Sequence, residues 1–253
     1  MRKLFPVFIA LLYLSCGQGV LPSRPRISGV WGDPTGEKLE IYWYFLEGAD
    51  RYEVKGIDEK GEYSVLYEGT DTFAVLGDRY PYYTVVAYAP SDLQESDTVK
   101  VVPVEGSFQI HAHGSGFESA VCYDIDTTYE NRLSTCNPES GEVQPNVILL
   151  LDSLSFISPS KDTTRFGHKR LLYSSGGGDM APLPPSGYAD TFPVVAGETV
   201  AVWIDGGIAD TFDLTDNVVR VVVDSLYVGD GSRDSISVWV SIRYQTVPRL
   251  RWY

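Results

Sequence analysis

The segment KLEIYWYF, Lys38 to Phe45, alternates in polarity so that Leu39, Ile41 and Trp43 share one face of an extended chain. Similar period-two segments follow in quick succession: RYEVKGI, YSVLYEG, YYTVVAYA and DTVKVVPV. Turn residues separate them, and none shows the 3.6-residue period of an amphipathic helix. Short strands at this regular spacing predict a first β-sandwich domain over residues 25–104.

The order of these features resembles a fibronectin type III domain. Pro25 stands at the place of that family's early proline, and Trp43 at that of its core tryptophan on the second strand. Tyr52-Glu53-Val54 matches the third strand, and the segment from Tyr83 to Ala87 matches the strand that carries the tyrosine corner. The preceding loop, GDRYPY, departs from the family because it lacks the usual leucine and "PG" pair. The resemblance implies a spacer or interaction module without catalytic activity.

Residues 106–253 continue the alternation in longer segments. The predicted strands are SFQIHAHG, SAVCYDI, NVILLLDSLSFI, KRLLYSS, TVAVWIDG, NVVRVVVDSLYV and SISVWVSIRYQT. Nearly continuous apolar runs at residues 146–151 and 218–223 indicate strands covered on both faces. We therefore expect an all-β chain whose second domain is a larger β-sandwich or a jelly roll. Pieces such as YDIDT and VWVSIRYQT are similar to patterns in uncharacterised exported bacterial proteins, which implies no activity.

The chain begins with MRKLFPVFIALLYLSC, in which Arg2 and Lys3 precede an uncharged apolar run from Leu4 to Leu14. This is the pattern of a secretory signal. A run this short is not expected to cross a bilayer permanently, since a helix needs about 20 apolar residues for that.

The end of this run resembles the lipobox of bacterial lipoproteins, where a small residue precedes a cysteine that is lipidated on sulfur. Ser15 and Cys16 fit the pattern, and Tyr13 departs from it. The resemblance implies a signal and lipid anchor over residues 1–16, a tether over 17–24 and a bilayer as partner. It places the protein in the cell envelope, at the outer membrane or cell surface. The alternative is an ordinary signal peptide cleaved near Ser15 or Gly19.

The two remaining cysteines, Cys122 and Cys136, are predicted to form a disulfide. An exported protein resides where disulfides persist. A bridge across this short loop would stabilise the fold by roughly 3 kcal/mol in the chain-entropy model. Two reduced, buried cysteines are the alternative, because spacing alone does not bring two Cβ atoms together.

The chain carries 34 acidic and 20 basic residues, for a net charge of −14. Nucleic acid is excluded as an expected partner, because phosphate binding requires clustered Lys and Arg. The acidic residues are spread over turns and strand edges, where solubility explains them.

Two groups of carboxylates are candidate calcium ligands, although no cofactor is otherwise expected. One group is Asp124 and Asp126, and the other is Asp205, Asp210 and Asp213. The alternative is turn chemistry, in which aspartates bind nearby backbone amides. His111 and His113 would share a strand face, but a metal site needs further ligands, so a zinc site is not expected.

The motifs G-x-S-x-G, Walker A and H-E-x-x-H are all absent, so we expect no enzyme. Trp203 and Trp239 are candidate ligand-binding residues, because each alternates with valines on a predicted strand. Outward-facing tryptophans would form a sugar-stacking platform, whereas inward-facing ones would pack the core. The favoured function is thus non-enzymatic binding, of a protein or glycan partner, or a structural role at the cell surface. A carbohydrate-binding accessory protein is the alternative, and a hydrolase is the least favoured.

Overall fold

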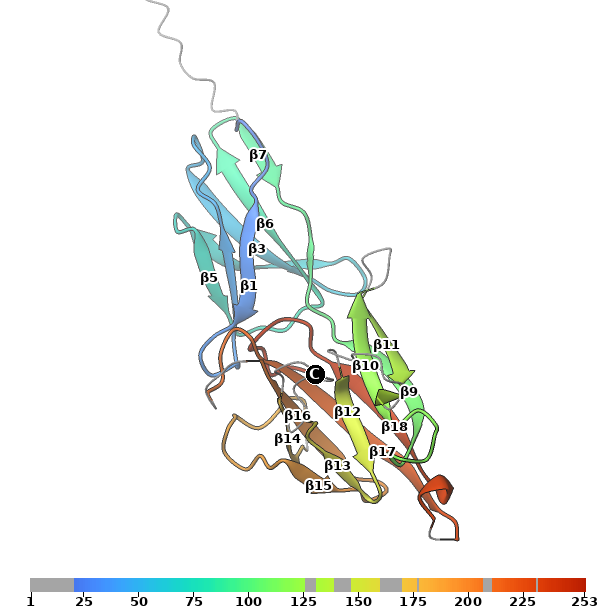
Figure 1. Ribbon diagram of the computed structural model, residues 1–253. Coiled ribbons are helices and arrows are strands. Elements are labelled where there is room, and N and C mark those ends of the chain that lie inside the picture. Colours follow the sequence, from blue (N-terminus) through green and yellow to red (C-terminus); the bar gives the residue numbers. More distant parts are fainter. Residues whose placement is uncertain are drawn as a thin grey trace, which may run out of the picture.

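The computed structural model describes residues 21–125, 131–138, 147–159, 170–176, 178–206, 211–230 and 232–253 of the 253-residue chain. They form an all-β protein in which two antiparallel sandwiches follow one another along an elongated molecule (Figure 1). Within these ranges, no helix has both the length and the apolar character needed to cross a membrane.

The first sandwich consists of two facing antiparallel sheets. One has the strand order β1-β2-β5, formed by Ile27–Gly32, Leu39–Trp43 and Phe73–Leu76. The other has the order β4-β3-β6-β7, formed by Tyr63–Gly69, Arg51–Ile57, Tyr82–Ala89 and Asp92–Glu95, with β8 (Val99–Lys100) also paired to β6. Immunoglobulin-like sandwiches divide their strands in the same way, with the first, second and fifth facing the third, sixth and seventh.

Aromatic side chains fix the core of this sandwich. Trp43 on β2 is buried and packs on Tyr52 and Tyr67, with ring centroids 5.6 and 6.0 Å away. The buried Tyr83 forms a tyrosine corner: its hydroxyl donates to the carbonyl of Asp78 at 2.8 Å and accepts from the amide of Tyr80 at 2.9 Å. The corner therefore forms even though the loop before it departs from the family pattern.

The second sandwich has two five-stranded antiparallel sheets. One runs in the order β11-β10-β12-β13-β15, formed by Asn131–Cys136, Ala120–Ile125, Val147–Asp152, Ser155–Ile157 and Thr191–Pro193. The other, called the long sheet below, runs β14-β16-β17-β18-β9, formed by Arg170–Ser175, Thr199–Asp205, Asn217–Val228, Ile236–Tyr244 and Val104–His111. Because β9 starts at Val104, the second sandwich begins directly where the first one ends.

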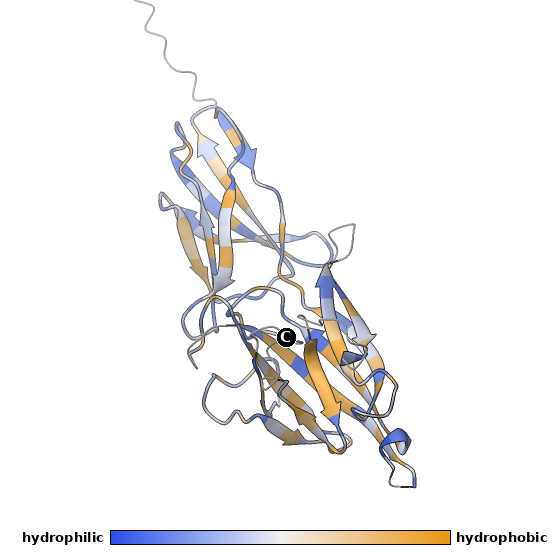
Figure 2. Cartoon of the chain, in the orientation of Figure 1, coloured by the Kyte–Doolittle hydropathy of each residue, from blue (hydrophilic) through white to orange (hydrophobic). Residues whose placement is uncertain are grey.

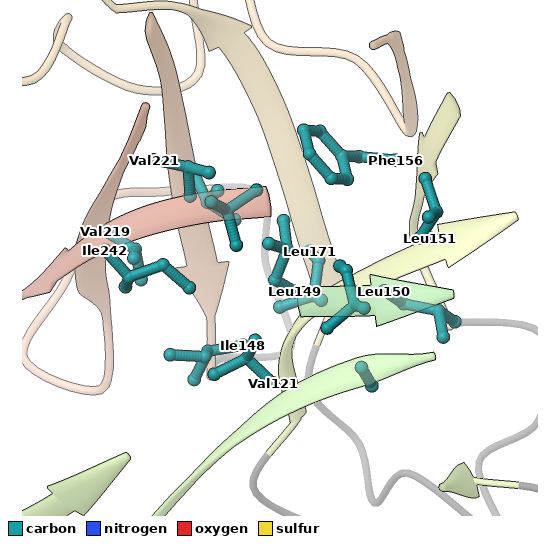
Figure 3. Close-up of a cluster of buried hydrophobic side chains, with 14 of the residues drawn as sticks. Val121, Ile148, Leu149, Leu150, Leu151, Phe156, Leu171, Val219, Val221 and Ile242 are labelled. Carbon is teal, nitrogen blue, oxygen red and sulfur yellow. The ribbon is translucent and has the colours of Figure 1, made fainter. Parts of the chain in front are cut away.

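Aliphatic side chains from both sheets fill the second core, with Leu149, Leu171 and Val221 among those meeting in Figure 3. Strand β12 is buried from Val147 to Leu151, and Figure 2 shows it as a nearly continuous hydrophobic strand. The segment NVILLLDSLSFI is two strands rather than one, because the chain turns at Ser153, where φ is +52°, and β13 pairs back on β12. Strand β17 differs from the expectation, since Arg220 and Val222 point away from the core and are only half-buried.

The chain returns to the first sandwich after β18. Val247, Leu250 and Trp252 are buried in the core of that sandwich. The backbone is bonded to the loop between β1 and β2, where the amide of Arg251 donates to the carbonyl of Gly36 at 3.0 Å. Residues 246–253, called the C-terminal clamp below, therefore pack against the first sandwich although they follow the last strand of the second.

Candidate functional site

Strand β18 separates the core of the second sandwich from the outer face of the long sheet. Val238, Val240 and Ile242 point into the core. The alternate residues, which include Trp239 and Arg243, point outward. The outer face is covered on one half, over β14 and β16, and open on the other, over β17, β18 and β9.

The covered half contains Trp203. Its side chain is fully buried, and Tyr188 packs edge-on against it at a ring-centroid distance of 5.9 Å. Side chains from distant segments complete the cover around Ala201 and Val218, namely Ala181, Phe212 and Tyr253. Trp203 therefore packs within the protein and is not accessible to a ligand.

The open half is called the outer strip below. It comprises the outward residues of three adjacent strands: Glu105, Ser107, Gln109 and His111 of β9, Arg220, Val222, Asp224, Ser225 and Tyr227 of β17, and Ser237, Trp239, Ser241 and Arg243 of β18. A β-bulge between Val223 and Ser225 exposes the two consecutive residues Asp224 and Ser225. The strip is thus polar along its length, with two exposed aromatic rings near one end.

Trp239 stands at the aromatic end of the strip with 48 % of its side chain exposed. Gln109 lies directly opposite on β9 and Ser225 opposite on β17. Tyr227, which is 65 % exposed, lies diagonally from Trp239, within reach of an aromatic side chain. A depression of about 460 Å³ lies here, lined by these four residues together with His111, Asp234, Ser235 and Ser237.

Gln109 and His111 contribute polar side chains to this depression. The amide nitrogen of Gln109 donates to the hydroxyl of Ser237 at 3.2 Å, which leaves the amide oxygen as an acceptor. The ring of His111 packs near Phe117, at a centroid distance of 4.9 Å. Its Nδ1 atom is buried and has no hydrogen-bond partner among the described residues.

A second depression, of about 420 Å³, lies at the other end of the strip. Arg220 and Arg243 are directly opposite one another on β17 and β18. Arg243 forms a salt bridge with Glu105 at 2.9 Å. Arg220 forms no salt bridge with any residue in the described ranges, and its Nε atom is buried without a hydrogen-bond partner there.

A short hydrogen-bond network lies on the strip between Trp239 and Arg243. The hydroxyl of Ser241 donates to the carboxylate of Asp224 at 2.8 Å, and the hydroxyl of Ser107 lies 3.0 Å from that of Ser241. The middle of the strip is therefore polar and carries one negative charge, whereas the far end carries the two arginines.

The predicted disulfide is present. Cys122 on β10 and Cys136 on β11 are bonded, with their Cα atoms 6.0 Å apart. The bridge joins two adjacent strands of a hairpin at the edge of the sheet.

Three of the candidate calcium ligands lie among the described residues. The carboxylate of Asp213 accepts hydrogen bonds from the amide and hydroxyl of Thr215 at 2.8 and 2.6 Å, and these bonds lower its pKa. Asp205 is buried at the end of β16, and Asp124 is exposed on β10. Within the described ranges, no three His, Cys, Asp or Glu side chains gather as metal ligands would. Cys16, Asp126 and Asp210 lie outside those ranges.

Asp216, near the same loop, has a different role. It is fully buried and accepts hydrogen bonds from the amides of Gly206 and Asp213 at 3.0 and 2.9 Å. Burial raises its pKa to about 6, even though these amide bonds favour the charged form. Asp216 therefore links Gly206, directly after β16, to Asp213.

His111 and His113 do not act as a pair on one strand face. Strand β9 ends at His111, and His113 lies in the following turn with its Nδ1 3.5 Å from the hydroxyl of Ser119. Trp239 was predicted from the sequence as a ligand-binding residue, whereas Arg220 and Gln109 were not. The one signal for Arg220 was a cation interrupting the apolar run of β17.

Comparisons with known proteins add little to this geometry. No protein family model matches the chain, and no curated protein matches it. Among solved structures, one match is described as "Titin kinase and its flanking domains", with 11 % sequence identity and a TM-score of 0.25. The match covers 90 % of this chain, which spans 38 % of the length of that structure. A similarity of this degree supports no conclusion about function.

Proposed function

We propose that this protein is an exported lipoprotein, anchored in a bilayer through acylated Cys16, with a non-enzymatic binding role at the outer membrane or cell surface. The sequence of the first 16 residues supports the anchor. The disulfide between Cys122 and Cys136 supports export, because such bonds persist outside the cytosol.

The observation that carries the binding role is the open outer strip. The outer face of an antiparallel sheet is commonly polar and solvated, whereas this face also exposes the aromatic rings of Trp239 and Tyr227 between its polar side chains. The strip lies on the second sandwich, whereas the amide of Leu21 donates to the carboxylate of Asp92 on β7, a strand at the end of the first sandwich away from the second (Figure 1). A chain anchored before Leu21 would therefore carry the strip away from the bilayer. The proposal assigns the protein no catalytic residue.

The anchor is tested by the intact mass of the protein from a bacterial membrane fraction, before and after reduction and alkylation, with Cys16→Ala as control. The expected result is a mass with acyl chains on Cys16, and alkylation of Cys122 and Cys136 only after reduction. A soluble protein that begins near Gly19 without lipid would contradict the anchor.

The binding role is tested by photo-crosslinking in intact cells. The variant Gln109→p-benzoylphenylalanine places the reactive group on the strip, and Lys60→p-benzoylphenylalanine places it on the exposed turn after β3 as a matched control. A cross-linked product is expected from position 109 and not from position 60. Equal products from both positions, or none from either, would contradict a role for the strip.

A carbohydrate-binding accessory protein is the second candidate function, favoured by the exposure of Trp239. Sugars present an apolar face that packs on an indole ring, which changes its fluorescence. Addition of glycans should therefore shift the emission of the wild type but not that of Trp239→Phe. Buried tryptophans such as Trp43 and Trp203 give the same background in both proteins.

A further inference from the structure

We propose that the outer strip binds a carbohydrate chain that carries carboxylates, such as a short oligomer of a uronic acid. This inference rests on the proposed binding role and names a ligand class for the same face. The strip combines an unpaired cation with an exposed indole, and the two are separated along the sheet.

The cation is Arg220. Like charges directly opposite one another on neighbouring strands destabilise a sheet, so the pair of Arg220 and Arg243 requires compensation. Glu105 compensates Arg243 alone. Arg220, half-buried and without a carboxylate partner in the described ranges, can accept one from a ligand, since a guanidinium binds a carboxylate through two parallel hydrogen bonds.

The indole is Trp239, whose ring is accessible at the opposite depression. The apolar C–H face of a sugar ring packs on an aromatic face, while its hydroxyls need both donors and acceptors around the rim. Gln109, Ser225 and Ser237 provide them.

The distance between the indole of Trp239 and the two arginines requires an extended ligand. Trp239 and Arg243 lie on one face of β18 four residues apart, which corresponds to about 13 Å along a strand. The hydroxyls of Ser107 and Ser241 lie between them, next to the carboxylate of Asp224. A free anion would reach only the arginines, and a single neutral sugar only the indole, so a chain of sugar rings is the ligand that engages both.

The net negative charge of the protein limits how many carboxylates the bound carbohydrate can carry. The protein carries a net charge of −14, Asp224 lies on the strip, and Asp234 lines the depression at its aromatic end. Long polyanions are repelled by such a field. A short oligomer, or a chain with widely spaced carboxylates, reaches Arg220 with less repulsion.

Calorimetric titration of the full-length protein with short oligogalacturonates, and with their methyl esters, tests the proposal. The ester keeps the sugar rings and removes the charge. The wild type should bind the free acid at least about ten-fold more tightly than the ester, which is the effect of one charge-assisted contact. Arg220→Gln should abolish this difference, and Trp239→Ala should weaken both ligands. Phe45→Ala, an exposed aromatic on the first sandwich, should change neither.

The thermal unfolding midpoint of each variant is measured first and should equal that of the wild type. A loss of binding then does not result from unfolding. Equal affinity for acid and ester, or full binding by Arg220→Gln, would overturn the proposal. So would binding of an acidic peptide in place of the sugar. If neither sugar binds while position 109 still cross-links in cells, the ligand class fails and the binding role stands. If position 109 gives no product either, both fail.

Discussion

The indole Nε1 of Trp252 donates a hydrogen bond of 2.9 Å to the backbone carbonyl of Glu37, which lies 215 residues earlier in the chain. The ring is buried in the core of the first sandwich, and the guanidinium of Arg79 lies over it at 5.2 Å from the ring centroid. Beside it, the buried Arg251 side chain donates to the carbonyls of Thr35 and Ala181. The C-terminal clamp therefore joins the two sandwiches, because it follows the last strand of the second and packs in the core of the first.

Truncation of the clamp tryptophan should destabilise the protein strongly. Trp252→Ala leaves a cavity in the first core and the carbonyl of Glu37 without its donor, at a cost of about 3–5 kcal/mol. Urea unfolding followed by circular dichroism measures the change. The matched control Trp239→Ala removes an exposed ring and should stay within about 0.5 kcal/mol of wild type. Equal stability of the two variants would show that the clamp does not hold the core.

The tyrosine corner should contribute measurably to stability. Tyr83→Phe keeps the ring but leaves the carbonyl of Asp78 and the amide of Tyr80 without a partner. Both hydrogen bonds are partly buried, and each bond of this kind contributes about 0.5–1.5 kcal/mol. The decrease is read from thermal unfolding against Tyr44→Phe, whose ring is exposed and whose midpoint should not move. Identical midpoints would exclude a stabilising corner.

The disulfide should stabilise the second sandwich. Replacing both cysteines, in Cys122→Ala/Cys136→Ala, is expected to lower the free energy of unfolding by about 3 kcal/mol in the chain-entropy model. A reducing agent should lower the urea midpoint of the wild type to that of the double variant. The reducing agent should not change the urea midpoint of the double variant. A change in that midpoint would show that the reducing agent acts on stability through something other than the disulfide.

Asp216 should make stability fall as the pH rises through the acidic range. Burial raises its folded-state pKa to about 6 from 3.8, so the folded protein binds this proton more tightly than the unfolded chain does. The stabilisation from this bound proton is complete below a pH of about 4 and is lost above a pH of about 6. The stability of Asp216→Asn relative to wild type should thus increase across this window in urea titrations. A constant difference from pH 4 to pH 6 would contradict the assignment.

Local sequence predicted the strands well but could not decide which outward side chains are accessible. Trp203 and Trp239 occupy equivalent places in the patterns VAVWI and SVWVS and lie on the same face of the long sheet. One is fully buried and the other is half-exposed. The difference comes from Tyr188 and Tyr253, which reach the sheet from segments distant in sequence. The alternation of residues predicts on which face of the sheet a side chain lies. Whether other segments cover that face depends on tertiary contacts.

The cationic depression and the clamp were missed for related reasons. Arg220 and Arg243 are 23 positions apart, and only the register of β17 against β18 places them opposite one another. The clamp lies directly after a regular strand, and nothing in the segment PRLRWY indicates in which of the two cores it packs. Both features depend on non-local pairing, which period and propensity do not encode.

The clamp also sets the order in which the chain can fold. During synthesis an N-terminal domain usually completes its fold first, before the rest of the chain has emerged. Here the first sandwich lacks Val247, Leu250 and Trp252 of its own core until residue 252 has been synthesised. Its core therefore stays incomplete while the strands of the second sandwich are being made. Closure of the first module then coincides with completion of the second.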